Sequence, residues 1–143
     1  MAAVYPYTTV DFNAPSVVDN QTGDVVWRKA AGALYDVDFT DTGGSALAAF
    51  TVKASTTPGG AGTDLIAFTT VAVSILSDSY TADWALPGAV FDALLDGATN
   101  FVTVRVVDGN ANATTLVDAF TVLKDTTPPA LADNQADDPV RRA

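Results

Sequence analysis

The strongest constraint on the fold is a period of two in the apolar side chains of two parts of the chain. Residues 34–40 and 101–108 both place an apolar side chain at every second position. Because successive side chains of a β-strand point to opposite faces, this pattern predicts two strands that are each buried on one face. The apolar positions expected to face the core are Tyr35, Val37, Phe39, Val102, Val104 and Val106.

Further strand candidates lie between clusters of Gly, Pro, Asn and Asp, which favour turns. A helix is indicated only at residues 87–97, where Pro87 stands at the start, apolar residues follow at helical spacing and Gly97 stands at the end. The sequence therefore predicts an all-β protein, an Ig-like antiparallel β-sandwich of about seven strands with one short helical crossover. The further strand candidates are residues 48–54, with Phe50 and Val52 inward, 65–68, 71–76, 79–86 and 116–124, with Phe120 and Val122 inward.

Composition supports this fold class and excludes several functions. All 17 acidic residues are Asp and there is no Glu, while the formal net charge is -10. Asp favours turns and Thr and Val favour strands, so a helical protein is not expected. An acidic chain with few Lys residues repels nucleic acids, and no apolar run approaches the roughly 18 residues of a membrane span. With no Cys in the chain, disulfide bonds and thiolate metal sites are excluded.

A stretch near the N-terminus returns near the C-terminus. At an offset of 114 positions, Asp11 aligns with Asp125 and Pro15 with Pro129, and the triplet Asp-Asn-Gln at 19–21 aligns with the same triplet at 133–135. Two unrelated surface turns rich in Asp and Pro are the open alternative. The shared register favours one full period of a repeat followed by the beginning of the next.

This repeat divides the chain into three parts. Residues 1–14 are expected to form a terminal strand or linker segment, because residues 7–11 match 120–125 with one gap. Residues 15–129 are expected to form the sandwich. Residues 130–143 would be a linker or the start of the next repeat.

Several short motifs resemble the Ig-like repeats of large secreted bacterial surface proteins. They are Leu-Asp-Gly at 95–97, Phe-x-Val-x-Val from 101, Val-Asp-Gly-Asn-Ala-Asn at 107–112 and Phe-x-Val-x-Lys-Asp-Thr-Thr-Pro-Pro at 120–129. The resemblance covers roughly residues 15–129 and implies an Ig-like sandwich. Many such sandwiches hold the corner before the penultimate strand with a Tyr hydroxyl. Phe101 stands at that position here, so we expect packing alone to hold this corner.

The residues needed for common hydrolytic mechanisms are missing. With no His and no Cys, the usual acyl-transfer constellations cannot form. Asp36 and Asp38 would lie about 7 Å apart on one strand face, a separation compatible with an inverting glycosidase. A solvated strand face explains these two acids better. We therefore expect no enzymatic activity.

Calcium is the cofactor that the turns of this chain favour most, although no cofactor is required. Ca²⁺ binds roughly six to eight oxygens from carboxylates, Asn side chains and carbonyls, which turns at the ends of a sandwich supply. The open alternative is that these residues form Asx turns that need no metal. The candidate ligands are Asp19, Asn20 and Asp24 in the repeated stretch, Asp108, Asn110 and Asn112 in a turn, and Asp125 at the linker.

The resemblance implies a structural, non-catalytic module of an extracellular, repetitive cell-surface protein or fibre. Its expected partners are other copies of the same module, joined head to tail in a tandem array or by strand complementation into a filament. Neither nucleic-acid binding nor membrane insertion is expected. The alternative is an adhesin-type module on a stalk that binds a carbohydrate or a host protein. Trp27 and Trp84 are interpreted as core residues, and a sugar-binding platform is the alternative role for them.

Overall fold

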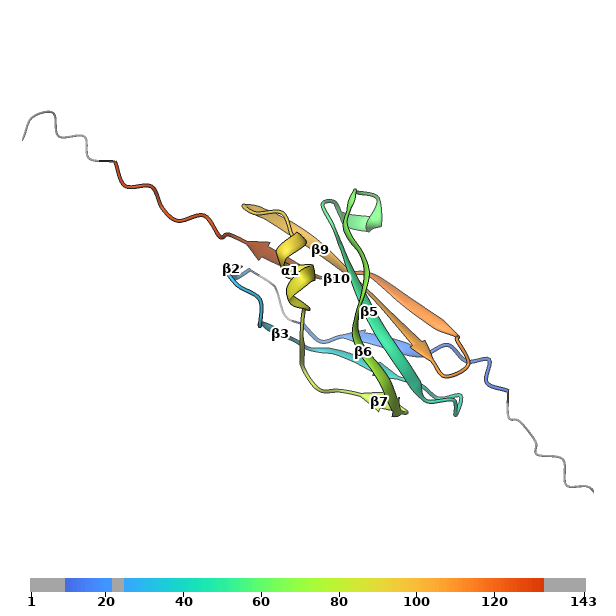
Figure 1. Ribbon diagram of the computed structural model, residues 1–143. Helices are drawn as coiled ribbons and strands as arrows, with labels where there is room; N and C mark the ends of the chain where they lie inside the picture. The colour runs from blue at the N-terminus through green and yellow to red at the C-terminus, as the bar shows by residue number, and fades with distance from the viewer. Residues whose placement is uncertain (1–9, 22–24, 133–143) are drawn as a thin grey trace, which may run out of the picture.

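The computed structural model describes residues 10–21 and 25–132, which contain ten strands, one α-helix and one 3₁₀ turn (Figure 1). The elements are, in chain order, β1 (Ser16–Asp19), β2 (Trp27–Arg28), β3 (Leu34–Tyr35), β4 (Val37–Thr40), β5 (Leu47–Ser55), η1 (Pro58–Gly60), β6 (Asp64–Ser77), β7 (Ser79–Tyr80), β8 (Trp84–Ala85), α1 (Gly88–Ala93), β9 (Ala98–Asp108) and β10 (Ala113–Lys124).

The strands form three sheets. The largest has the order β2-β10-β9-β5-β6, and its pairs are antiparallel except for β10 with β2, which run parallel. A second sheet has the order β1-β4-β7, and β3 pairs with β8 alone. The prediction of an all-β protein is confirmed, and the short helical crossover is present as α1.

The core lies between the five-stranded sheet and the sheet of β1, β4 and β7. The ring of Phe50 on β5 lies 4.5 Å from that of Phe39 on β4 and 5.1 Å from that of Trp84 on β8. Aromatic pairs of this kind stabilise a fold by about 0.5–1.5 kcal/mol each beyond the burial of their surface. The predicted inward positions are all at most 5% exposed: Tyr35, Val37, Phe39, Phe50, Val52, Val102, Val104, Val106, Phe120 and Val122.

The extents of several strands differ from the sequence prediction. Residues 34–40 form β3 and β4, and residues 79–86 contain β7 and β8, so each predicted strand is divided between two sheets. Conversely, residues 65–68 and 71–76 belong to the single 14-residue strand β6 at a sheet edge. Alternation specifies the face that a residue takes but not the partner strand, which explains why the faces were right and the strand limits wrong.

The prediction of two core tryptophans is correct for Trp84 and wrong for Trp27. Trp84 is 4% exposed, and its indole N–H donates to the carbonyl oxygen of Val37 at 3.2 Å. Trp27 is 52% exposed because it lies on β2, the edge strand that pairs with the end of β10. One Trp therefore stabilises the core and the other remains available on the surface.

The corner before β9 is held by hydrogen bonds, so the expectation that packing alone holds it is wrong. The residue next to Phe101, Asn100, is fully buried. Its Oδ1 accepts from the N–H of Leu95 at 2.8 Å, and its Nδ2 donates to the carbonyl oxygens of Leu95 and Val122 at 3.0 and 3.1 Å. This amide joins the segment after α1 to β9 and β10.

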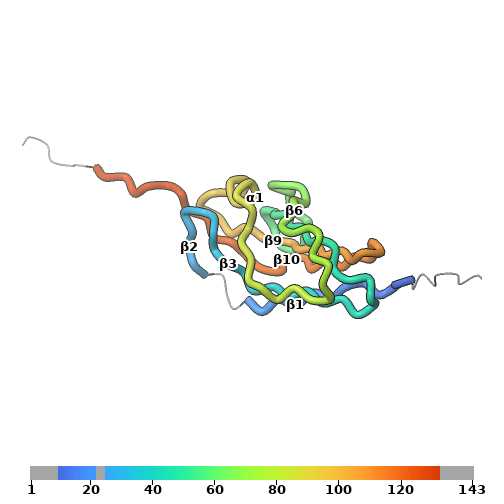
Figure 2. The backbone as a smooth tube through the Cα atoms, turned by 60° about the horizontal axis from the view of Figure 1, so that its bottom comes forward, coloured from blue at the N-terminus to red at the C-terminus, as the bar shows by residue number. Residues whose placement is uncertain are grey.

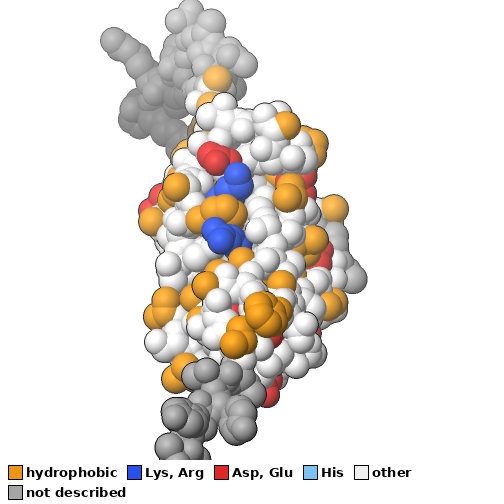
Figure 3. Space-filling view, turned by 90° about the vertical axis from the view of Figure 1, so that its right-hand side faces the viewer, with side chains coloured by type: hydrophobic (Ala, Val, Ile, Leu, Met, Phe, Trp, Pro, Cys, Tyr) orange, Lys and Arg blue, Asp and Glu red, His pale blue; other side chains and the backbone are white. Residues whose placement is uncertain are grey.

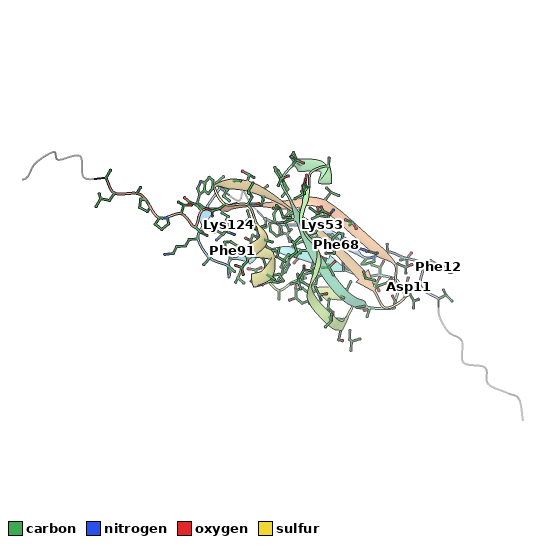
Figure 4. The ribbon with its side chains drawn as sticks, turned by 45° about the horizontal axis from the view of Figure 1, so that its top comes forward. Asp11, Phe12, Lys53, Phe68, Phe91 and Lys124 are labelled. Carbon is green, nitrogen blue, oxygen red and sulfur yellow. The ribbon has the colours of Figure 1, made fainter. Side chains whose placement is uncertain are left out.

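The two described ends of the chain leave the molecule at opposite ends (Figures 1 and 2). We call these the N-terminal pole, where residues 10–14 meet the sheets, and the C-terminal pole, where residues 125–132 leave them. Figure 4 shows Asp11 at the first pole and Lys124 near the second. Within the described residues, no helix has the length and apolar character needed to cross a membrane.

Candidate metal centre

Three aspartates from distant parts of the chain meet at the N-terminal pole. Asp11 precedes β1, Asp41 directly follows β4, and Asp108 is the last residue of β9. They are 6%, 4% and 2% exposed, and one carboxylate oxygen from each lies within 4.8 Å of the others. Figure 3 looks from the side of this pole, and acidic side chains appear there only in small, separate patches. The low exposure of the three side chains makes the cluster internal.

Asp108 is fixed by the turn that joins β9 to β10. Its Oδ1 accepts from the backbone N–H groups of Asn110 and Asn112 at 2.9 and 2.8 Å. Its Oδ2 accepts from Nδ2 of Asn112 at 2.7 Å. An Asp followed by Asn at the second and fourth positions thus forms an Asx-type turn that sets the direction of the Asp108 carboxylate.

Asp11 fastens the N-terminal segment to the loop between β4 and β5. Its Oδ2 accepts from the hydroxyl and the N–H of Ser45 at 2.7 and 3.2 Å, and its Oδ1 accepts from the N–H of Asn13 at 2.8 Å. The hydroxyl of Ser45, followed by the N–H of Asn13, lowers the pKa of Asp11 below its ordinary value, and burial acts in the opposite direction. Asp11 is thus held as a carboxylate.

The backbone of Asp11 is held as well. Its carbonyl oxygen accepts from Nδ2 of Asn112 at 3.1 Å and from Nδ2 of Asn110 at 3.4 Å. The two Asn side chains therefore connect the N-terminal segment to the β9–β10 turn. Both Asn side chains act here as hydrogen-bond donors.

Asp41 has one carboxylate oxygen without a partner. Its Oδ1 accepts from the N–H of Gly43 at 3.2 Å, but Oδ2 is buried and has no hydrogen-bond partner. A buried polar atom left without a partner costs about 1–3 kcal/mol, and more when it is charged. This oxygen is the strongest sign in the described residues that the site holds something further.

Gly43 allows the three acids to come together. A Cβ atom at this position would lie 1.7 Å from Oδ1 of Asp11 and 2.0 Å from its Oδ2. The carboxylate of Asp11 therefore packs directly on the backbone of the loop that follows Asp41. Any side chain at position 43 would displace it.

Among residues 10–21 and 25–132, no Lys or Arg side chain forms an ion pair with these three carboxylates. In the described part of the chain, the ion pair within 4 Å joins Lys53 to Asp64 on β5 and β6, and the three clustered acids form none. Carboxylates this close repel one another unless a cation or a proton lies among them. Since the chain contains no His and no Cys, the ligands on offer are oxygens, which suit a hard cation such as Ca²⁺ and do not suit Zn²⁺.

The residues predicted as calcium ligands are only partly brought together. Asp108 belongs to the cluster, and Asn110 and Asn112 contact it as donors. Asp19 and Asn20 lie at the far end of β1, where Asp19 accepts from the N–H of Gln21 and Asn20 donates to Asp36 and Asp38. Asp24 lies outside the described residues. Asp125 follows β10 at the C-terminal pole.

Sequence reasoning missed Asp11 and Asp41 as members of the site. Asp11 carried a signal, since the repeat aligns it with the predicted ligand Asp125. Asp41 begins the Asp-Thr-Gly-Gly turn, but only pairing of β4 within its sheet brings that turn to the N-terminal pole.

Comparison with known proteins adds no relative to this description. No protein-family model matches the chain, and no curated protein or solved structure is significantly similar to it. The site is therefore interpreted from its own geometry.

Proposed function

We propose that the chain is a structural, non-catalytic β module of the Ig-like sandwich type whose N-terminal segment is fastened by calcium bound among Asp11, Asp41 and Asp108. The observation that supports this most is the free, buried oxygen of Asp41 beside two further buried carboxylates. Three carboxylates offer three to six oxygens, and water or carbonyl groups complete the roughly six to eight that Ca²⁺ takes.

The position of the site suits a mechanical role. Its three ligands come from the incoming segment, from the turn after β4 and from the end of β9, so one ion would cross-link parts of the chain that are far apart in sequence. Cross-links of this kind stabilise a fold because ligand binding adds to the free energy of unfolding. A joint fixed in this way transmits force from the N-terminal segment directly into the long strand β9.

The positions of the two poles support a role as one of several modules that follow one another in a line. The chain enters and leaves at opposite ends of the sandwich, and the exit segment is also held, by Asp96. Oδ1 of Asp96 accepts from the N–H and the hydroxyl of Thr126 at 2.7 and 2.8 Å, and Oδ2 accepts from the hydroxyl of Thr127 at 2.8 Å. With the 114-residue repeat, this favours a link in a head-to-tail array on a cell surface, where modules bind calcium with Kd values of about 0.1–1 mM.

Calcium titration tests the proposal. We expect one ion to bind per chain, measured by isothermal titration calorimetry, and Asp41→Asn to weaken binding at least about 10-fold through loss of a charged ligand. Asp92→Asn is the matched control, because it removes the same charge from an exposed position on α1. Binding that is unchanged in the Asp41 variant, or absent from the unaltered chain, would exclude this site.

The hydrogen bonds between Asp96 and the segment after β10 predict a pH-dependent loss of stability. Hydrogen bonds from the Thr126 hydroxyl, from Thr127 and from the Thr126 N–H lower the pKa of Asp96. Its contribution is therefore complete above the ordinary Asp pKa of about 3.9 and is lost as the pH falls through the lower folded value. We expect Asp96→Asn to unfold at a lower urea concentration than the unaltered chain near pH 7. The difference between their two urea midpoints should shrink near pH 3. A difference in urea midpoint that persists or grows in acid would contradict this role of Asp96.

One observation favours the alternative, a binding module on a stalk. Trp27 is 52% exposed, and the two residues directly before it, Val25 and Val26, are 79% and 57% exposed. An exposed indole beside apolar side chains is a surface on which a sugar ring can stack. Quenching of Trp27 fluorescence by an oligosaccharide, absent in Trp27→Phe, would support this role over the purely structural one.

A further inference from the structure

The longest strand in the described residues has one side to which no other described strand is bonded. β6 is the last strand of the five-stranded sheet, and its ladder partner there is β5. Figure 1 shows it running beside β5 from η1 to β7. In the described part of the chain, the backbone hydrogen bonds outside the sheets and α1 involve none of residues 64–77. We call this outer side the free edge of β6.

The free edge of β6 has little protection against pairing with another strand. An unpaired edge presents a row of backbone N–H and C=O groups, and proteins usually guard it with charged side chains, proline or bulges. Residues 65–77 form the longest stretch of the chain without a charged residue, and they contain no proline. Three apolar side chains of the strand are also exposed, since Phe68, Val73 and Leu76 are 39%, 66% and 81% exposed.

Bulges limit the length over which this edge can pair. Ser74 and Leu76 have φ angles of 54° and 53°, in the left-handed region, and the ladder with β5 shifts its register at several points. A bulge bends a strand and interrupts regular pairing. The part of the free edge that suits pairing best is therefore residues 64–73, which span roughly 33 Å at the usual rise of a strand.

The other sheet edges are shorter or are guarded by charge. At the opposite edge of the same sheet, β2 has two residues and contains Arg28. β10 extends beyond β2, but a bulge interrupts it between Leu116 and Phe120, where Asp118 has a φ of 53°. In the second sheet, the edge strands β1 and β7 have four and two residues. Among the described edge strands, β6 combines the greatest length with the least charge.

Charge indicates which partner fits this edge. At a net charge of -10, two copies of the chain repel one another wherever their acids face each other. The free edge lets two copies approach without bringing unpaired acids together, because Asp64 is the one charged residue of β6 and it is paired with Lys53 at 2.9 Å. The same lack of charge offers nothing to an acidic or a basic partner. A neutral strand fits best, and each copy supplies one.

The sequences at the two ends of the chain are less suited to this edge than β6 itself. Residues 1–9 contain Pro6, and residues 133–143 contain Pro139 and five charged residues. Proline cannot donate to a ladder, and charged residues disfavour pairing at an edge. The β6 of another copy is therefore the best-matched strand that this chain provides.

We propose that the free edge of β6 pairs with β6 of a second copy, antiparallel and about a two-fold axis, so that the two five-stranded sheets become one continuous sheet. The same strand serves both copies, so the contact closes at a dimer. It joins modules side by side and needs no calcium. Residues 64–73 are fewer than the roughly 20–30 residues per side of a standard interface, so we expect a weak dimer with a Kd between about 1 µM and 1 mM.

Sedimentation velocity of the full chain tests this inference, at concentrations from about 1 µM to about 1 mM. We expect monomers at the lowest concentration and dimers at the highest. Thr70→Lys places a charge at an exposed position in the middle of β6, and it should weaken dimerisation more than about 10-fold because like charges from both copies meet at the contact. Thr99→Lys is the matched control, because it makes the same change at an exposed position of β9, between β10 and β5, and should leave the dimer intact.

Hydrogen exchange of the backbone amides identifies the strand that pairs. We expect exchange in residues 64–77 to slow as the concentration of the unaltered chain rises, with no such change in residues 1–9. Equal urea midpoints for the Thr70 and Thr99 variants would show that the lost dimer is not a result of unfolding. If the Thr70 variant is less stable than the control, the exchange measurement on the unaltered chain decides.

Three results would overturn the inference. The first is a chain that stays monomeric over the whole concentration range. The second is a dimer that persists unchanged in Thr70→Lys, because its contact then lies elsewhere. The third is concentration-dependent protection in residues 1–9, because the N-terminal segment would then be the added strand.

Discussion

Calcium at about 10 mM is expected to raise the melting temperature of this chain by roughly 10 °C over a chelated sample. A ligand at 100 times its Kd stabilises the folded state by about 2.7 kcal/mol, and a concentration near 10 mM reaches that ratio for a Kd of about 0.1 mM. For a domain of this size, 1 kcal/mol corresponds to about 4 °C. The measurement is thermal unfolding followed by circular dichroism, with calcium and with a chelator.

The controls for this shift use both the metal and the protein. Mg²⁺ at the same concentration should give a smaller shift, because it demands a tighter octahedral shell and gives up its water reluctantly. Asp41→Asn should remove most of the calcium shift, whereas Asp92→Asn should keep it. Equal melting temperatures with calcium and with chelator would show that the buried carboxylates hold no calcium.

Gly43→Ala is expected to weaken calcium binding roughly 100-fold, the upper range for disturbing the support of a metal ligand. The new Cβ would lie 1.7 Å from Oδ1 of Asp11, so the carboxylate or the loop must move. Overpacking of this kind also costs about 1–3 kcal/mol of stability. Titration calorimetry measures the first effect and urea unfolding the second.

Gly88→Ala is the matched control for Gly43→Ala. A Cβ at Gly88 would meet no atom within 4 Å, and this glycine begins α1 near the other pole. We expect calcium binding and stability close to those of the unaltered chain. Normal calcium affinity in Gly43→Ala would show that the close approach of Asp11 to this loop is not required for the site.

The alternation of side chains was enough to predict which residues form the core. The faces of β4, β9 and β10 follow from local sequence, because a residue's side of a strand is fixed by its position in a period of two. The same pattern could not predict where β3 ends and β4 begins, or that β6 is continuous. Those features depend on which strands pair, and pairing is decided by contacts between residues distant in the chain.

Two single residues show the same limit. Trp27 was predicted in the core because large apolar side chains are usually buried, yet its short strand lies at a sheet edge. Asn100 was not predicted to have a role, although its amide makes hydrogen bonds to two segments at the corner before β9. Both outcomes depend on what surrounds the residue in three dimensions.

By itself, the sequence determined the chemistry available to this protein: strands with one apolar face, turns rich in Asp and Asn, and metal ligands restricted to oxygen. It also placed Asp11 and Asp125 at equivalent positions of a repeat. Only the tertiary structure decided that Asp11, Asp41 and Asp108 share one buried site, because no local spacing connects them. They meet because strand pairing brings the end of β4 and the end of β9 to the same pole, where Gly43 leaves room for the carboxylate of Asp11.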